Sequence, residues 1–187
     1  MLRIIMHFIM FLIALASSIF LFINNHVTEG IVVLLFSFLI LGLIAGIYLI
    51  EKKKQALKDI YTGVYNELGF QRDYQKLHKG LEAGKITELY LMKLTVQSEH
   101  TDLIKPIGTL LNERFSFDTK AYFNNGIFGV LFVNLSGIIV KEMKNQVETW
   151  LNDMFKQKEV TVKYEITYFE VNKTMTYESV LEKIKED

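Results

Sequence analysis

Two long apolar runs dominate the first fifty residues of the chain. Residues 4–23 read IIMHFIMFLIALASSIFLFI, and residues 31–50 read IVVLLFSFLILGLIAGIYLI. Each run has the length that an α-helix needs to cross about 30 Å of hydrocarbon. The short connection NNHVTEG joins them, so the pattern predicts a hairpin of two spanning helices. A signal peptide is the alternative interpretation of the first run, but that run is long for this purpose and no clear polar cleavage region follows it.

Beyond residue 50 the apolar positions follow shorter repeats that are typical of a folded, water-soluble domain. Spacings of three and four residues predict helices, and alternation predicts strands. The expected elements are a helix over 70–81, a strand over 88–97, a helix over 103–111, a hairpin over 121–134, a helix over 138–158, a strand over 160–171 and a short helix over 176–187. This order predicts an α+β domain, in which helices pack on a mainly antiparallel sheet.

Two features of this pattern predict local structure in detail. Asn125-Gly126 lies between apolar runs, and this dipeptide supplies the positive φ values that a tight hairpin turn needs. In the helix over 138–158, an apolar stripe at helical spacing predicts the buried face. Its members are Ile139, Met143, Val147, Trp150, Leu151 and Met154. Folding alone accounts for both features.

Formal charge separates the two regions. The chain of 187 residues has 21 basic and 21 acidic residues, yet residues 1–50 contain only Arg3 and Glu29. Four lysines follow the second apolar run, namely Lys52, Lys53, Lys54 and Lys58. The connecting loop has no basic residue, so the positive-inside rule predicts that both termini are cytoplasmic. Zero net charge provides no field that would attract nucleic acid, and we expect no such partner.

These patterns predict three segments. Residues 1–50 form the transmembrane hairpin in the lipid bilayer, 51–58 a basic juxtamembrane helix, and 59–187 the cytoplasmic domain. No Gly/Ser/Pro linker separates them, which places the domain close to the bilayer. Gly42 and Gly46 have the small-xxx-small spacing that lets helix backbones approach each other. This spacing serves either packing within the hairpin or contact with another chain.

The residues alone offer little chemistry. The sequence has no cysteine, which excludes disulfides and thiolate zinc sites. Its four histidines, at positions 7, 26, 78 and 100, lack metal-binding spacing, and no Gly-rich phosphate loop of the P-loop kind is present. We therefore expect no metal, cofactor or catalytic group from composition and spacing.

The stretch DIYTGVYNELGF resembles the start of the GGDEF domain of diguanylate cyclases, D-x-L-T-G-L-x-N-R-x-x-F. Asp59, Thr62, Gly63, Asn66 and Phe70 match this pattern in register. The later stretch YFNNGIFGVLF is similar to the family's R-Y-G-G-D-E-F-A-V-L-L, and the order of elements follows the family. The resemblance covers the chain from about residue 59 to the C-terminus. It implies a GGDEF-like, nucleotide-cyclase palm-type fold in a bacterial membrane protein.

The same resemblance implies a degenerate signature turn. Asn124, Asn125, Gly126, Ile127 and Phe128 stand where the family has Gly, Gly, Asp, Glu and Phe. The double glycine that lets the nucleotide approach and the two acidic residues are therefore replaced.

The metal-binding strand is altered as well. LMKLTV resembles the family's L-x-D-I-D-x, which puts Lys93 and Thr95 at the aspartate positions. Magnesium prefers oxygen ligands, and an ammonium group repels it. The guanine-reading stretch that follows this strand in the family is largely deleted, and the sequence ends before the family's last helix with its phosphate-contacting residues. The resemblance thus implies a truncated domain without catalytic residues.

The family also has a product-inhibition motif, R-x-x-D, five residues before the signature. Asp118 falls at the aspartate position, whereas Phe115 takes the arginine position and Arg114 lies one residue early. Asp118 and Arg114 are therefore candidate ligands for a cyclic dinucleotide. Alternatively, Asp118 is an ordinary aspartate in a turn and binds no ligand.

Three functions follow as hypotheses. The leading one is a non-catalytic membrane-anchored regulatory or assembly subunit, whose GGDEF-like domain binds another protein such as an exopolysaccharide synthase, another membrane enzyme or a second copy of the chain. The alternative is a sensor that binds a cyclic dinucleotide or another nucleotide in the vestigial cleft. The third, a residual cyclase or nucleotidase, is disfavoured because phosphoryl transfer needs the missing metal ligands.

Overall fold

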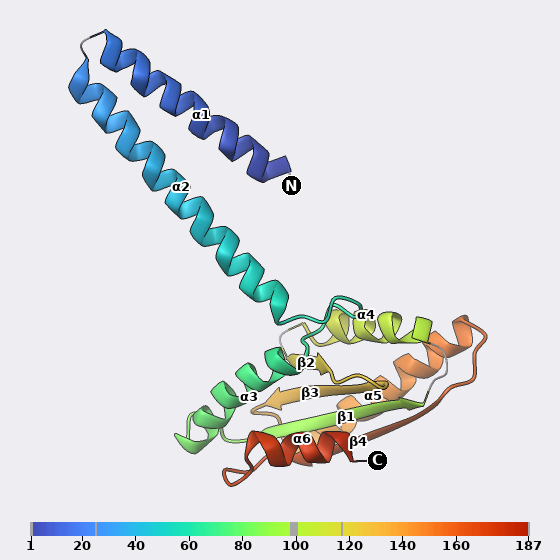
Figure 1. Cartoon of the computed structure of the whole chain (residues 1–187). Helices are drawn as coiled ribbons and strands as arrows, with labels where there is room; N and C mark the ends of the chain where they lie inside the picture. The colour runs from blue at the N-terminus through green and yellow to red at the C-terminus, as the bar shows by residue number, and fades with distance from the viewer. Residues whose placement is uncertain (1, 25, 98–100, 117, 187) are drawn as a thin grey trace. The chain divides into compact units, whose positions relative to one another are not determined.

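The computed structural model of the chain (Figure 1) describes residues 2–24, 26–97, 101–116 and 118–186. Side chains are described from Met10 onward, except that of Thr101. The side chains of Arg3 and His7, and all of His100, lie outside these described parts. The chain divides into two compact units, Met1–Ala56 and Leu57–Asp187.

The first unit consists of two helices, α1 (Leu2–Ile23) and α2 (Val27–Ala56). The buried Ser18 hydroxyl donates to the carbonyl of Gly30 at 2.8 Å, and the rings of Phe11 and Phe38 meet edge to face at 6.1 Å. By length and composition α2 can cross a membrane, and the described side chains of α1 form a shorter apolar helix, Met10–Ile23. The two helices fit a hairpin and suggest membrane anchoring.

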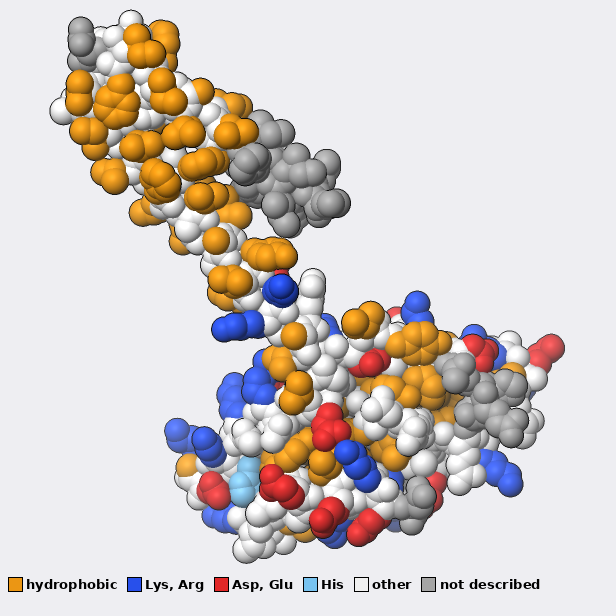
Figure 2. All heavy atoms as spheres, viewed as in Figure 1, with side chains coloured by type: hydrophobic (Ala, Val, Ile, Leu, Met, Phe, Trp, Pro, Cys, Tyr) orange, Lys and Arg blue, Asp and Glu red, His pale blue; other side chains and the backbone are white. Residues whose placement is uncertain are grey.

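The connection between the two helices differs from the sequence pattern. The connection is shorter than NNHVTEG, because α2 already begins at Val27. Among the described residues, no atom lies within 4 Å of a Cβ added at Gly42 or Gly46. Figure 2 shows apolar side chains over the visible face of the hairpin, whereas charges of both signs are spread over the second unit.

The second unit has the α+β architecture that the sequence predicts. Its elements are α3 (Glu67–Glu82), β1 (Leu89–Gln97), the short 3₁₀ turn η1 (Thr101–Leu103), α4 (Ile104–Arg114), β2 (Thr119–Tyr122), β3 (Ile127–Val133), α5 (Gly137–Gln157), β4 (Lys163–Glu170) and α6 (Tyr177–Lys185). The strands form a four-stranded sheet in the order β2-β3-β1-β4. All three neighbouring pairs are antiparallel.

The sheet separates two hydrophobic cores, because alternate side chains of a strand point to opposite faces. On β1, Met92 and Leu94 belong to the core under α4 and α5, whereas Leu89 and Leu91 belong to the core under α3 and α6. All four side chains are buried. In Figure 1, α3 and α6 accordingly lie on one side of the sheet and α4 and α5 on the other.

One boundary and one buried stripe that the sequence predicts need correction. The last strand begins at Lys163 and not at Val160, because β1 ends at Gln97, which pairs with Lys163 and leaves earlier residues without a neighbouring strand. On α5 the predicted stripe is displaced by one residue at its start. Ile139 is exposed, whereas Val140 is buried in the core. Phe155, which the predicted stripe omitted, is also buried.

The loop before α3 is held by its own side chains. One carboxylate oxygen of Asp59 accepts hydrogen bonds from the backbone N–H and the hydroxyl of Thr62, both at 2.7 Å. Gly63 has a φ of 75°, which favours glycine. The Asn66 side chain then caps α3 by accepting from the Gly69 N–H at 3.0 Å. The residues that carry the resemblance in this stretch therefore have a structural role here.

The same loop joins the edge of the sheet. The Tyr65 N–H donates to the carbonyl of Lys120 at 3.0 Å, and the Tyr122 N–H donates to the carbonyl of Tyr65 at 2.9 Å. This parallel bridge fixes the loop beside β2 and creates the wall of a pocket.

Candidate functional site

The hairpin between β2 and β3 has the turn that Asn125-Gly126 predicts. Asn124, Asn125 and Gly126 have φ values of 68°, 48° and 79°. The Ile127 N–H donates to the carbonyl of Asn124 at 2.9 Å and closes the turn. A Cβ added at Gly126 would lie 2.2 Å from the carbonyl oxygen of Val96. Glycine at this position is therefore required both by its φ and by the neighbouring strand.

The sheet brings together the positions that the resemblance implies for metal binding. Thr95 on β1 is the direct partner of Ile127 on β3, and Val96 donates its N–H to the carbonyl of Gly126 at 3.0 Å. Lys93 lies two residues along the same face of β1, opposite Gly129. The positions that the resemblance assigns to the family's strand and signature ligands are thus neighbours in this fold, where they hold Lys93, Thr95, Gly126 and Ile127.

The side chains now at these positions do not fit a divalent cation. They offer an ammonium group, a hydroxyl and an apolar chain in place of carboxylates. The Lys93 ammonium donates a hydrogen bond to the backbone carbonyl of Glu186, just after α6. Magnesium is held through carboxylates and other hard oxygen ligands. In the described parts of the chain, no group of three His, Asp or Glu side chains is arranged to hold a metal ion.

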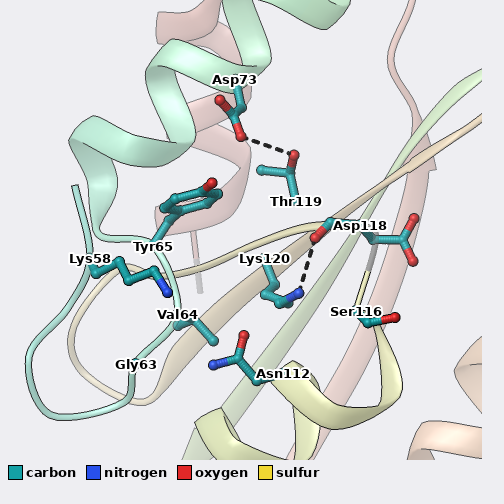
Figure 3. A pocket seen from close by; sticks show the side chains of 10 residues that line it. All are labelled: Lys58, Gly63, Val64, Tyr65, Asp73, Asn112, Ser116, Asp118, Thr119 and Lys120. Atoms are coloured by element: carbon teal, nitrogen blue, oxygen red, sulfur yellow. Dashed lines mark hydrogen bonds between the residues drawn. The ribbon is translucent and has the colours of Figure 1, made fainter. Parts of the chain in front are cut away.

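A pocket of about 330 Å³ lies beside β2, near the start of the second unit (Figure 3). The loop before α3 forms one wall, and α3, α4 and the start of β2 form the others. Its lining residues are Lys58, Gly63, Val64, Tyr65, Asp73, Asn112, Ser116, Asp118, Thr119 and Lys120. Two lysines and two aspartates therefore face one polar cavity.

Lys120 is the buried cation of this pocket. Its ammonium group donates to the carbonyl of Phe115 and, at 3.3 Å, to the backbone carbonyl of Asp118. Burial lowers the pKa of Lys120, and Lys58 acts in the same direction, whereas Asp118 opposes them. The two backbone carbonyls therefore hold the ammonium group in place at the pocket.

The two aspartates differ in their surroundings. Burial raises the pKa of Asp118, and the charge of Lys120 partly offsets this effect. Figure 3 shows the Asp118 carboxylate pointing away from the Lys120 ammonium group, so their hydrogen bond uses the backbone. Asp73 accepts from Arg72 at 2.7 Å and from the Thr119 hydroxyl at 3.4 Å. Among the described residues, the ion pair with Arg72 therefore holds Asp73 but not Asp118.

The structure does not bring Arg114 to Asp118. The guanidinium of Arg114 lies 4.9 Å from the centre of the Trp150 ring, against α5. Asp118 lines the pocket, and Arg114 is not among the lining residues. Phe115, at the family's arginine position, is buried against Phe132 and Trp150. The two candidate ligand residues therefore lie in different surroundings. Asp118 lines a polar pocket, whereas Arg114 packs against the aromatic residues at α5.

Sequence reasoning missed Lys120 and Asn112 as pocket residues. The signal for Lys120 was a lysine between the strand residues Thr119 and Ala121, where an apolar residue would be ordinary. Asn112 gave no signal, because it is a polar residue on a helix that packs elsewhere through its apolar face.

A second, more open pocket of about 390 Å³ lies between α3 and the start of α6. Tyr74 and Tyr177 line it, with ring centres 5.9 Å apart. The Tyr74 hydroxyl donates to the carbonyl of Met175 at 2.7 Å. The buried Tyr177 hydroxyl has no hydrogen-bond partner among the described residues. Burial raises the pKa of each tyrosine to about 12, and nearby glutamates add to this effect.

Comparisons with known proteins identify the fold. No protein-family model matches the chain, and no curated protein matches it. Among solved structures, the coiled coil and GGDEF domain of DgcB from Caulobacter crescentus, in complex with c-di-GMP, is similar with a TM-score of 0.60 at 13% identity, over 73% of this chain and 81% of that one.

Two further structures extend this likeness. The diguanylate cyclase SiaD from Pseudomonas aeruginosa, in complex with its activator SiaC, is similar with a TM-score of 0.54 at 14% identity, over 90% of this chain and 73% of that one. A DGC protein from Thermotoga maritima has a TM-score of 0.52 at 16% identity, over 67% of this chain and 93% of that one. The second unit therefore has the GGDEF-like fold that the two short motifs indicated.

Proposed function

We propose that the chain is a non-catalytic, membrane-anchored regulatory or assembly subunit, and that its degenerate GGDEF-like domain binds another protein. One observation carries this proposal: the fold keeps the neighbouring strand and signature positions together, but fills them with Lys93, Thr95, Gly126 and Ile127. The Lys93 ammonium group donates a hydrogen bond to the Glu186 carbonyl at the C-terminal end of α6. The scaffold is kept while its metal-binding carboxylates are replaced.

The partner is expected in or at the membrane. The apolar hairpin suggests anchoring, and the lysines after residue 50 favour a cytoplasmic location for both termini in a bacterial membrane. An exopolysaccharide synthase, another membrane enzyme or a second copy of this chain are the partner classes we favour. SiaD, which shares the fold, has been solved in complex with its protein activator. The choice of a synthase is an analogy with the fold family.

Two measurements test this proposal. The purified full chain in nanodiscs is incubated with GTP and magnesium beside an active diguanylate cyclase, and we expect no product from this chain. Native electrophoresis of mildly solubilised membranes then measures the size of the complex, which we expect to exceed that of one chain. Magnesium-dependent turnover, or a strictly single chain without a partner, would contradict the proposal.

The pocket beside β2 favours a second candidate function, the sensing of a cyclic dinucleotide or another nucleotide. Lys58 and Lys120 offer donors to phosphate, while Asp118 offers acceptors to a base. Calorimetry on the full chain in nanodiscs with c-di-GMP, c-di-AMP, GTP and ATP tests it. Binding that is lost in Asp118→Asn but kept in Arg114→Ala would support this pocket. Absence of heat at high micromolar ligand would eliminate it.

A further inference from the structure

The loop Asp59–Gly63 presents two neighbouring apolar side chains to solvent. Ile60 is fully exposed, and the Tyr61 side chain is about half exposed, at 49%. A single exposed apolar residue is ordinary on a soluble protein. Two at the tip of one loop, at the start of a folded domain, call for a specific account.

Hydrogen bonds within the loop hold Ile60 away from the core. The Asp59 carboxylate binds the N–H and hydroxyl of Thr62, and the Gly63 N–H donates to the Asp59 carbonyl at 2.9 Å. Thr62 itself is buried against α4, where a Cβ added at Gly108 would lie 2.6 Å from the Thr62 Cβ. The loop is therefore closed below its tip, and Ile60 has no route into the core without breaking these bonds.

Basic residues flank this tip in the sequence. Lys58 lies two positions before Ile60, and Lys52, Lys53 and Lys54 precede it on the last turns of α2. The acidic residues in the same stretch are Glu51 and Asp59, and the Asp59 carboxylate is bound to Thr62. A basic segment next to a spanning helix gains about 1 kcal/mol per lysine from anionic lipid headgroups. The combination of cations and apolar side chains matches the chemistry of a membrane interface.

Chain length places the loop within reach of that interface. If the second span ends at Ile50, the six remaining residues of α2 extend about 9 Å beyond the hydrocarbon. Ile60 follows Ala56 by four positions, and four residue steps span at most about 14 Å. The headgroup layer is itself about 5–8 Å thick on each side. The covalent connection therefore allows Ile60 to reach the lipid surface.

We infer that Ile60 and Tyr61 are a membrane-interface anchor, which inserts among anionic phospholipid headgroups and holds the GGDEF-like domain at the inner leaflet. Tyrosine is enriched at this depth because its ring is apolar and its hydroxyl is polar. A lipid surface fits better than a protein, because two side chains are far smaller than a standard protein interface. This inference rests on the membrane anchoring contained in the proposed function.

The absence of native cysteine allows a direct test. Single cysteines are introduced into the full chain as Ile60→Cys, Ile138→Cys and Leu39→Cys and labelled with a polarity-sensitive fluorophore. Ile138 is a matched control, because it is also apolar and 83% exposed but lies in the first turn of α5. Leu39 lies in the proposed second span and reports membrane insertion itself. The chains are reconstituted in vesicles of phosphatidylcholine and phosphatidylglycerol that carry a lipid-bound quencher.

We expect the label to be quenched at positions 39 and 60 but not at 138. Removing phosphatidylglycerol should weaken quenching severalfold at 60 and leave it unchanged at 39. If the label is quenched at 39 but position 60 behaves like 138, Ile60 is not an interface anchor. That result leaves the proposed membrane anchoring through the hairpin intact. Absence of quenching at 39 contradicts that anchoring as well. A label at 60 that is shielded from water but not quenched by lipid indicates a protein contact, which also overturns the inference.

Discussion

The ammonium group of Lys93 on β1 donates a hydrogen bond to the backbone carbonyl of Glu186, immediately after the end of α6. A helix leaves carbonyl groups unpaired at its C-terminus, and a cation there is favourable. Lys93 therefore ties the centre of the sheet to the last helix of the chain. The resemblance of the sequence to the GGDEF family aligns Lys93 with a metal-ligand position of that family.

Replacing Lys93 with Met should weaken this connection. The change keeps most of the apolar stem and removes the ammonium group, so we expect a loss of about 1 kcal/mol in the free energy of unfolding. Lys163→Met, at an exposed position on β4, is the control and should change stability by less than about 0.5 kcal/mol. The single tryptophan, Trp150, reports on the second unit alone when the full chain in detergent is titrated with denaturant. Equal effects of the two variants would contradict this role for Lys93.

Gly126→Asp would restore an acidic residue of the family's signature, and we expect it to be strongly destabilising. Its Cβ would lie 2.2 Å from the Val96 carbonyl oxygen, and φ is 79°. The backbone pairing of β1 and β3 must then shift, at a cost of about 3 kcal/mol or more.

Gly84→Asp separates the cost of a positive φ from the cost of the close contact with Val96. Gly84 has a φ of 71°, and among the described residues no atom lies within 4 Å of an added Cβ. This control should cost only about 1–2 kcal/mol, the penalty for a side chain at positive φ. The same fluorescence titration compares the two variants. If both cost the same, the contact with Val96 is not what requires glycine at Gly126.

Local chemistry explains which parts of the fold could be predicted. The hairpin turn follows from Asn125-Gly126, since both residues adopt positive φ there. The helices and the antiparallel sheet follow from the spacing of apolar residues. Where a boundary depends on a distant partner, the sequence was insufficient: β4 starts at Lys163 because its partner β1 ends at Gln97.

The candidate site was less predictable, because long-range packing decides it. Arg114 and Asp118 are close in sequence, yet Trp150 on α5 takes the arginine side chain. The burial of Lys120 depends on carbonyls of the segment between α4 and β2. Motif spacing contains neither relationship, so it identified one pocket residue, Asp118, and missed the cation beside it.

Two helix caps provide the next prediction. The Asn66 side chain accepts from the Gly69 N–H at 3.0 Å at the start of α3. Ser136 stands at the corresponding position of α5, but its side chain makes no capping hydrogen bond. We expect Asn66→Ala to lower the melting temperature through a loss of about 1 kcal/mol, and Ser136→Ala to change it little. Comparable losses in the two variants would mean that the hydrogen bond from Gly69 to Asn66 does not account for the stabilisation of α3.

The buried tyrosines Tyr74 and Tyr177 should limit stability at alkaline pH. Burial raises the pKa of each to about 12, above the 10 of an unperturbed tyrosine. Between these values the unfolded chain loses protons that the folded chain keeps. Their contribution is therefore fully present below pH 10 and is lost as pH rises toward 12.

Phenylalanine substitutions distinguish the two residues. Tyr74→Phe removes a hydroxyl that donates to the Met175 carbonyl at 2.7 Å, so it should cost about 1 kcal/mol at neutral pH. Tyr177→Phe removes a hydroxyl without a partner among the described residues, so it should be neutral or stabilising by up to about 1 kcal/mol. Both variants should lose stability less steeply than the parent above pH 10, because each removes one titrating group. Denaturant titrations followed by Trp150 emission at neutral and alkaline pH measure the free energy of unfolding. If it falls with pH as steeply in both variants as in the parent, other groups cause the alkaline loss of stability.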